Sequence, residues 1–386
     1  MNVLFDSQIF DLQTHGGISR CFAELYTHMP EHVRAKIGIV ETNNIYLQQY
    51  GFKHVGDTYL EFMGSHSPFL RRLRYKMHYQ FKYGKYSHWN RTPQLNQLEQ
   101  ERLLKEGDYD VFHPTFYNPY FLPYMGDKPF VVTVHDMIPE IYTQFFAKDG
   151  IMKQWKQEVV PKASHIVAVS EYTKQDLIRI MGIAEDKISV VYHGADDSPY
   201  IPTPQRPYDF EYILYVGERS FYKNFMPFYQ ECLPLLKRYK DLKVVCTGKP
   251  FTEEELSVFE GTGMKNRMIQ IFTTSDQQLM DLYHHALAFV YPSEYEGFGI
   301  PILEAYKADC PVMLNHASCF PEIAGDAAIY FGFQSSSPKF EEQFEALYHL
   351  DSHERESLLA KQRDRLKKFS WEESARSLAK IYEQVI

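Results

Sequence analysis

The sequence predicts an α/β protein built from two Rossmann-like units, each with a parallel sheet. Short apolar runs ending in Gly, His or Ser alternate with amphipathic segments of helical period, which is the pattern of a buried parallel sheet whose strands are connected by helices. The pattern stops once, in a proline-rich segment at residues 197–211, and then begins again. A chain of 386 residues also favours two domains over one.

The first unit is expected to span residues 1–196, with six apolar runs as its strands. These runs are NVLF (2–5), AKIGIV (35–40), DVFHPTF (110–116), FVVTVHD (130–136), HIVAVS (165–170) and ISVVYHG (188–194). Helices are expected between them, for example over SRCFAELYTHM (19–29) and SEYTKQDLIRIMG (170–182), with Ser170 as a candidate N-cap.

The second unit is expected over residues 212–369, after the linker at 197–211. Its strands are predicted at YILYVG (212–217), LKVVCTG (242–248), IQIFTT (269–274), LAFVYPS (287–293) and CPVMLN (310–315). The last segment, 370–386, carries apolar residues at helical spacing and is predicted to be a closing helix. Open α/β sheets bind ligands at the carboxyl ends of their strands, so we expect the two sheets to face a shared cleft.

The composition narrows the class of protein. A formal charge of -9 argues against nucleic-acid binding through a generally basic surface. Five cysteines without a C-x-x-C pair suit reduced thiols in a cytoplasmic protein and argue against a zinc site. The first residues, MNVLFDSQIF, lack the basic and apolar regions of a signal peptide, and no apolar run in the chain approaches the length of a membrane-spanning helix.

The segment YPSEYEGFGIPILEA (291–305) has the features of an anion-binding turn. Gly297 and Gly299 allow tight backbone geometry and close approach of a ligand, and Pro301 suits the first turn of a helix. The free N–H groups of a helix start favour phosphate, and Glu304, one turn later, can reach a sugar hydroxyl. The alternative is an ordinary strand-turn-helix corner in which Glu296 and Glu304 are merely solvated.

This segment closely resembles the Glu-x7-Glu motif of retaining glycosyltransferases of family 4, which have the two-domain GT-B fold. Further segments resemble this family in the same order along the chain, and only residues from about 45 to 105 lack a matching motif. These segments are THGGISRCF (14–22), TVHDMIPEIY (133–142), VSEYTKQDL (169–177), VYHGAD (191–196), YVGERSFYKNF (215–225) and FSWEESA (369–375).

The resemblance implies a site for a nucleotide-sugar donor. Glu304 would hold the nucleotide ribose, Glu296 would lie near the donor sugar, and Arg219 with Lys223 would stabilise the departing diphosphate. Without the resemblance, Arg219 and Lys223 also fit a solvated loop. The implied donor-binding residues are Gly16, Gly17, Gly217, Gly297, Phe298, Gly299, Ile300 and Glu304.

His135 ends the run FVVTVHD, where the family places a histidine that contacts the donor; alone, it also fits a structural histidine. We count it as catalytic together with Glu296, Arg219 and Lys223. Asp136 and His15 are the expected acceptor-binding residues. His193 stands where the family usually has Asn, and we interpret its segment as the turn into the linker.

No metal or other cofactor is expected. Asp108-Tyr109-Asp110 has the D-x-D pattern with which other glycosyltransferases hold a metal. The pattern precedes its strand, however, on the side away from the expected cleft, and the GT-B arrangement uses a helix N-terminus and basic residues instead.

A basic and aromatic stretch lies in this acidic chain. No acidic residue occurs between Glu61 and Glu99, whereas Arg71, Arg72, Arg74 and Lys76 lead a series of basic residues among aromatic ones. Such a stretch suits an anionic membrane surface, because each basic residue near the surface contributes about 1 kcal/mol to the binding free energy. A solvated helix and RNA binding are the alternatives.

The function expected from the resemblance is retaining transfer of a hexose from a nucleotide-diphosphate sugar to a glycan or lipid-linked glycan, at the inner face of the cytoplasmic membrane. GDP-mannose is the first expected donor, with UDP-sugars and dTDP-rhamnose as alternatives. A non-catalytic nucleotide-sugar or glycan binder and a GT-B phosphorylase or epimerase are the competing functions.

Overall fold

The computed structural model describes residues 1–55, 77, 92–146, 150–196, 198–273 and 275–386. The chain divides into two compact units. Unit 1 comprises Met1–Val169, Thr173–Gly194 and Trp371–Ile386, and unit 2 comprises Ser170–Tyr172 and Ala195–Ser370. Among the described residues, none of the helices combines the length and the apolar character that crossing a bilayer requires.

Unit 1 contains two parallel three-stranded sheets, in the orders β2-β1-β3 and β4-β5-β6. Their strands are β1 (Asn2–Phe5), β2 (Arg34–Ile37), β3 (Val111–His113), β4 (Val131–Val134), β5 (His165–Ala168) and β6 (Ile188–Val190). A parallel bridge between Phe112 and Phe130 connects the first sheet to the second. Strands β3 and β4 are buried at every position, as expected for a parallel sheet covered on both faces.

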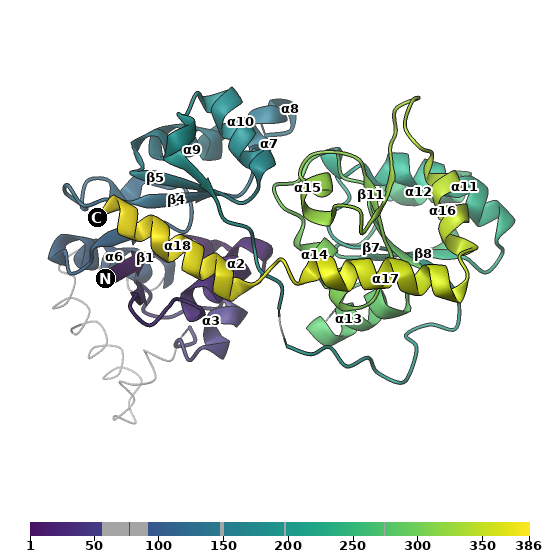
Figure 1. The fold of residues 1–386 in the computed structure, drawn as a ribbon, viewed down its shortest axis with the longest axis horizontal. Coiled ribbons are helices and arrows are strands. Elements are labelled where there is room, and N and C mark those ends of the chain that lie inside the picture. Colours follow the sequence, from purple (N-terminus) through teal and green to yellow (C-terminus); the bar gives the residue numbers. More distant parts are fainter. Residues whose placement is uncertain (56–76, 78–91, 147–149, 197, 274) are drawn as a thin grey trace. The chain divides into compact units, whose positions relative to one another are not determined.

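The described residues of unit 1 also form helices, several of which lie beside its strands in Figure 1. They are α1 (Gln8–Leu12), α2 (Gly17–Thr27), α3 (Ile45–Gln49), α6 (Thr92–Glu106), α7 (Ile138–Ile141), α8 (Thr143–Phe146), α9 (Gly150–Val159), α10 (Glu171–Met181) and α18 (Trp371–Val385), with single 3-10 turns at Pro119–Phe121, Val160–Lys162 and Glu185–Lys187.

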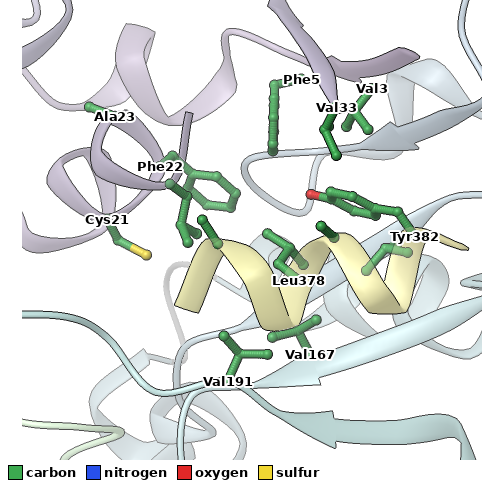
Figure 2. Close-up of a cluster of buried hydrophobic side chains, with 14 of the residues drawn as sticks. Val3, Phe5, Cys21, Phe22, Ala23, Val33, Val167, Val191, Leu378 and Tyr382 are labelled. Carbon is green, nitrogen blue, oxygen red and sulfur yellow. The ribbon is translucent and has the colours of Figure 1, made fainter. Parts of the chain in front are cut away.

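The C-terminal helix α18 is part of the unit 1 core. Figure 2 shows Leu378 and Tyr382 of this helix among Phe5 of β1, Phe22 of α2 and Val167 of β5. All five side chains are buried. The last residues of the chain therefore contribute to the same apolar core as the first strand, and removing them would expose that core.

Unit 2 contains one parallel sheet of six strands in the order β12-β11-β10-β7-β8-β9. The strands are β7 (Tyr212–Tyr215), β8 (Lys243–Thr247), β9 (Met268–Ile271), β10 (Ala288–Tyr291), β11 (Val312–Asn315) and β12 (Ile329–Phe331). The helices are α11 (Phe225–Arg238), α12 (Glu253–Gly261), α13 (Asp276–His285), α14 (Ile300–Lys307), α15 (Phe320–Ala324), α16 (Phe340–Tyr348) and α17 (Ser352–Leu366), with 3-10 turns at Phe221–Lys223 and Lys265–Arg267.

Local sequence signals fix several helix starts in unit 2. Thr252 and Glu255 form a capping box at α12, and Asp351 and Glu354 form one at α17. Each box satisfies N–H groups that a helix start otherwise leaves without partners. Helix α14 has Gly299 as its N-cap and Pro301 in its first turn, so no side chain caps it.

Candidate active site

The strand order of unit 2 reverses at one place. The chain starts in the middle of the sheet at β7, adds β8 and β9 on one side, and then returns to place β10 on the other side of β7. The loops that follow β7 and β10 diverge at this point, which is where open α/β sheets bind their ligands. The predicted residues Gly217, Arg219 and Lys223 follow β7, and Glu296 to Glu304 follow β10.

Lys223 and Glu296 form an ion pair at this switch point. The Nζ atom of Lys223 donates to Oε1 of Glu296 at 2.5 Å, and the two side chains are 18% and 11% exposed. A backbone hydrogen bond from the N–H of Glu294 to the carbonyl of Tyr222, at 2.7 Å, ties the two loops together. Burial, followed by the charge of Glu296, raises the pKa of Tyr291 well above its usual value. A cation and an anion are therefore held together at the end of two neighbouring strands.

The turn after Glu296 is held by residues that precede α15. The thiol of Cys319 donates to the carbonyl oxygens of Glu296 and Phe298, each at 3.2 Å, and the N–H of Glu296 donates to Ser318 Oγ at 3.2 Å. Gly299 has a φ of +97°, and a Cβ there would lie 3.1 Å from Ile302 and 3.3 Å from Phe320. Glycine is thus required both by the backbone conformation and by the space available.

Glu304 lies in α14, about one turn after the start of the helix, and is partly buried. Its Oε2 accepts a hydrogen bond from the hydroxyl of Tyr283 at 3.2 Å. Tyr283 is fully buried, and burial followed by the charge of Glu304 raises its pKa well above the usual value. The carboxylate of Glu304 therefore has a fixed neighbour and a defined position on the helix that Gly297, Phe298, Gly299 and Ile300 introduce.

Arg219 contacts a different carboxylate. Its guanidinium donates to both oxygens of Glu255, at 2.9 and 3.2 Å, and to the carbonyl of Pro250 at 2.8 Å. It also lies over the ring of Phe251, 4.7 Å from the ring centroid, and its side chain is only 6% exposed. In this structure Arg219 anchors the loop after β7 to α12, whereas Lys223 pairs with Glu296. Burial raises the pKa of the Tyr215 hydroxyl well above its usual value, with smaller effects from nearby groups that include Glu296, Arg219 and Glu255.

Gly217 begins this loop with a φ of +110°, and a Cβ built there would have nothing within 4 Å among the described residues. A backbone conformation that L-residues rarely adopt, combined with open space, marks a place where a ligand can approach the main chain closely. The predicted donor residues of unit 2 thus lie on the two loops of the switch point.

In unit 1, His135 directly follows β4 and is buried at 8% exposure. Its ring stacks on that of His193, with centroids 5.8 Å apart, and meets Phe22 edge-on. Its Nε2 atom has no hydrogen-bond partner among the described residues. Burial lowers the pKa of His135 to about 3, with smaller contributions from His113 and Lys156. His135 is therefore neutral at physiological pH.

His193 is more than the turn residue that the sequence indicated. It is buried, its Nδ1 lies 3.2 Å from the thiol of Cys21, and its ring contacts Trp371. Burial lowers the pKa of His193 to about 3. A second neutral imidazole thus packs directly against His135.

Asp136 follows His135 and is partly buried. One oxygen of its carboxylate accepts from the N–H of Ile138 at 3.0 Å. Its backbone carbonyl accepts from the Nζ atom of Lys156 at 2.9 Å. The backbone at this predicted acceptor residue is thereby held by a side chain of α9.

The glycine loop of unit 1 forms the start of α2, with Gly16 at the N-cap and Gly17 as the first helical residue. His15 and Gly17 are exposed. The side-chain oxygen of Gln13 accepts from the N–H of Ser19 at 3.1 Å. The side chain of Gln13 therefore accepts from one of the N–H groups at this helix start, a group to which a ligand oxygen could otherwise bind.

Two of the remaining predictions concern other parts of the chain. Asp110, in the D-x-D sequence, precedes β3 and accepts the N–H of Asn2 at 2.6 Å. Within the described ranges, no three His, Cys, Asp or Glu side chains gather as a set of metal ligands; that the reaction needs no metal stays a prediction. The predicted membrane residues Arg71, Arg72, Arg74 and Lys76 lie outside the described residues.

The fold and the arrangement of the switch point define the class of protein: two Rossmann-like units of the GT-B type. In agreement, the structure aligns with a glycosyltransferase from Rickettsia africae over 100% of this chain and 98% of that one, at a TM-score of 0.68 and 17% identity. It also aligns with Anabaena Alr3699/HepE, solved in complex with UDP and glucose, over 99% of both chains, at a TM-score of 0.69 and 15% identity.

Matches to two family profiles identify the family of this chain. Residues 61–198 match the profile of Glycosyltransferase Family 4 and residues 200–368 match that of Glycosyl transferases group 1. The chain belongs to this glycosyltransferase family, which confirms the resemblance found in its motifs.

Two of the relatives are O-antigen mannosyltransferases. The chain is 26% identical over 245 residues to the O-antigen chain mannosyltransferase RfbU of Salmonella typhimurium, covering 64% of this chain and 65% of the relative. It is 30% identical over 237 residues to the O-antigen chain mannosyltransferase B of Escherichia coli, covering 58% of this chain and 61% of the relative. The match spans less than two thirds of either relative.

Proposed function

We propose that this protein is a metal-independent, retaining glycosyltransferase that moves a hexose from a nucleotide-diphosphate sugar to a hydroxyl group of a glycan. The observation that carries the proposal is the Lys223–Glu296 pair at the switch point of unit 2, directly before the uncapped start of α14. A cation, an anion and a row of backbone amides are the groups that recognition of a sugar diphosphate requires.

In this proposal the donor binds along the turn from Glu296 to Glu304. The N–H groups at Gly297, Phe298, Gly299 and Ile300 hold sugar hydroxyls or phosphate oxygens. The carboxylate of Glu304 holds the nucleotide ribose. Lys223 exchanges part of its contact with Glu296 for the diphosphate, which explains why a 2.5 Å ion pair lies where the loops diverge.

The reaction breaks the bond between the anomeric carbon and the diphosphate and forms a bond from that carbon to the acceptor oxygen on the same face. The bonding electrons leave with the nucleoside diphosphate, and the hydroxyl proton passes to the diphosphate or to solvent. Lys223 offsets the charge that develops on the leaving group. Glu296 stabilises the positive charge of an oxocarbenium-like transition state, and Arg219 keeps the loop of Lys223 in place.

In this proposal unit 1 supplies a neutral imidazole. His135 remains uncharged, and its Nε2 can hydrogen-bond a sugar hydroxyl or a phosphate oxygen. Asp136 and His15 are the proposed contacts to the acceptor. A neutral imidazole can accept a hydrogen bond from a hydroxyl group, whereas an imidazolium ion only donates.

GDP-mannose is the first proposed donor, because the curated relatives are named as mannosyltransferases, and a surface glycan such as an O-antigen chain is the proposed acceptor. UDP-sugars and dTDP-rhamnose are the competing donors. The experiment is to incubate the protein with each donor, with and without a mannose-bearing lipid-linked glycan, and to measure nucleoside diphosphate release and glycan mass. Release that depends on the acceptor, with one hexose added, supports the proposal. Binding without turnover of any donor would contradict it and favour a sugar-nucleotide binder.

We further propose that the basic stretch at Arg71, Arg72, Arg74 and Lys76 contacts the anionic inner face of the cytoplasmic membrane. The support is the absence of acidic residues between Glu61 and Glu99 in a chain of net charge -9. Liposome flotation tests it: binding to anionic vesicles should weaken with salt and with Arg71, Arg72 and Arg74 changed to Glu. Binding that ignores both changes would refute membrane contact through this stretch.

A further inference from the structure

Lys156 and Glu140 form an ion pair in the interior of unit 1. Their side chains are each 2% exposed, and the Lys156 Nζ lies 2.9 Å from Glu140 Oε2. Removing two charges from water costs several kcal/mol per ion, and an apolar pair of similar size is often at least as stable. This pair is therefore poorly explained by stability alone.

The contacts of Lys156 converge on the dipeptide His135-Asp136. Its Nζ donates to the carbonyl of Asp136 at 2.9 Å and lies 5.1 Å from the centroid of the Tyr117 ring. The hydroxyl of Tyr117 in turn accepts the N–H of His135 at 3.3 Å. The dipeptide is thus held at both ends, by the hydroxyl of Tyr117 at its amino side and by the ammonium of Lys156 at its carboxyl side.

The imidazole of His135 is left for another partner. Phe22 and His193 pack against its ring, while its Nε2 has no hydrogen-bond partner among the described residues. Three charged or titratable groups act on it electrostatically or lie against it, namely His113, Lys156 and His193. Of these, His113 and His193 are themselves kept neutral by burial, and Lys156 is the member of this set that forms an ion pair, with Glu140.

We propose that Lys156, with Glu140 as its counter-ion, is a positioning residue that fixes His135 and Asp136 for contact with the sugar substrates. The inference rests on the proposed function for its kinetic consequence, but not for its structural one. Lys156 acts through the dipeptide and does not itself touch a substrate.

The test compares wild type with the double variant Lys156→Met/Glu140→Met, which replaces the buried pair with apolar side chains and is expected to fold. Lys162→Met is the matched control, because Lys162 pairs with Glu158 at the surface and is 54% exposed. In the double variant we expect kcat to fall about 10- to 100-fold, as for a catalytic group displaced by about 1 Å, while the donor KM stays within about twofold and the melting temperature stays near that of wild type. Unchanged kcat in the folded double variant would overturn the proposal.

A second readout needs no turnover. In protein labelled with 15N at histidine, the His135 ring signals, assigned by their loss in His135→Asn, should shift in the double variant and stay in place in Lys162→Met. Unchanged His135 signals would overturn the positioning role whatever the activity. If the wild type is inactive with every donor and the His135 signals still shift in the double variant, the proposed function is refuted but the positioning role is supported.

Discussion

Both units are built on parallel strands, but the titratable side chains that follow these strands differ in charge. At the switch point of unit 2, Lys223 and Glu296 form an ion pair, with side chains 18% and 11% exposed. At the carboxyl ends of β3, β4 and β6 in unit 1, His113, His135 and His193 are buried and neutral. Under the proposed function, unit 2 offers a charged pair to a charged donor, whereas His135 of unit 1 offers the uncharged Nε2 of its imidazole to a hydroxyl.

The variant with the largest expected effect removes the charge of Glu296 at the switch point of unit 2. In Glu296→Gln we expect kcat to fall about 10²- to 10³-fold, in the range found when one group that stabilises transition-state charge is removed. Glu218→Gln is the matched control, because Glu218 pairs with Lys249 at the surface and is 57% exposed. Steady-state kinetics measure both variants. Equal activity of Glu296→Gln and the control would show that the switch point carries no chemistry.

A second test disturbs the packing of unit 1 by adding a Cβ atom at a glycine. A Cβ at Gly194 would lie 2.2 Å from the backbone nitrogen of Trp371 and 2.5 Å from its ring. Gly194→Ala must therefore displace the start of α18, and we expect a loss of about 3 kcal/mol in the free energy of unfolding. Gly261→Ala is the control, since nothing lies within 4 Å of a Cβ at that position among the described residues. Urea denaturation measures both, and equal stability of the two variants would contradict the packing described for α18.

Acid should weaken unit 1 more than unit 2. The three histidines have pKa values of about 3 when folded and about 6.5 when unfolded, so the unfolded chain binds more protons between these values. Stability is thus full above pH 6.5 and falls as the pH decreases toward 3, by about 1.4 kcal/mol per pH unit for each histidine. Asp6 and Asp11 oppose this effect, because burial raises their pKa, that of Asp11 to about 6. A net loss of about 1 to 3 kcal/mol per pH unit is therefore expected near pH 5.

Tryptophan fluorescence can separate the two units in this measurement. Trp155 and Trp371 fall within unit 1, and Trp89 lies outside the described residues, whereas far-UV circular dichroism follows both units. At pH 5 the fluorescence transition in urea should precede the final dichroism transition, and at pH 7.5 the two should lie closer together. Fluorescence midpoints independent of pH between 7.5 and 5 would contradict the neutral histidine core.

The smallest expected effect concerns Glu304. Tyr283→Phe removes the hydroxyl that donates to Glu304 at 3.2 Å, and we expect the donor KM to rise about three- to tenfold with kcat nearly unchanged, as for the loss of one hydrogen bond of about 1 kcal/mol. Tyr306→Phe is the control, because the buried Tyr306 hydroxyl has no hydrogen-bond partner among the described residues. A donor KM that responds equally to both changes would remove Glu304 from the donor site.

The sequence predicted the fold class well because all-buried strands such as β4 and β10 leave short continuous apolar runs that alternate along the chain with segments of helical period. Strand β12 was missed, since IYF at 329–331 is short and only partly buried. The motif around Glu296 could be interpreted from the sequence because Gly297, Gly299 and Pro301 each favour a particular backbone conformation.

The partners of these residues were not readable from the sequence. Glu255 lies 36 positions from Arg219, and Cys319 lies 23 positions from Glu296. Lys156 is buried, whereas Lys153 of the same helix is not. Contacts of this kind depend on how strands are ordered in the sheet, and local periodicity carries no information about that order.

The most direct test of the central claim is a thermal-shift panel with GDP, UDP, dTDP and CMP and their sugar conjugates on wild type, Lys223→Ala and Lys249→Ala. A ligand that binds the folded state raises the melting temperature. We expect a shift with the nucleotides of one base in wild type and in Lys249→Ala, whose lysine is 80% exposed, and its loss in Lys223→Ala. An equal shift in Lys223→Ala, or no shift with any nucleotide, would contradict a donor site at the switch point.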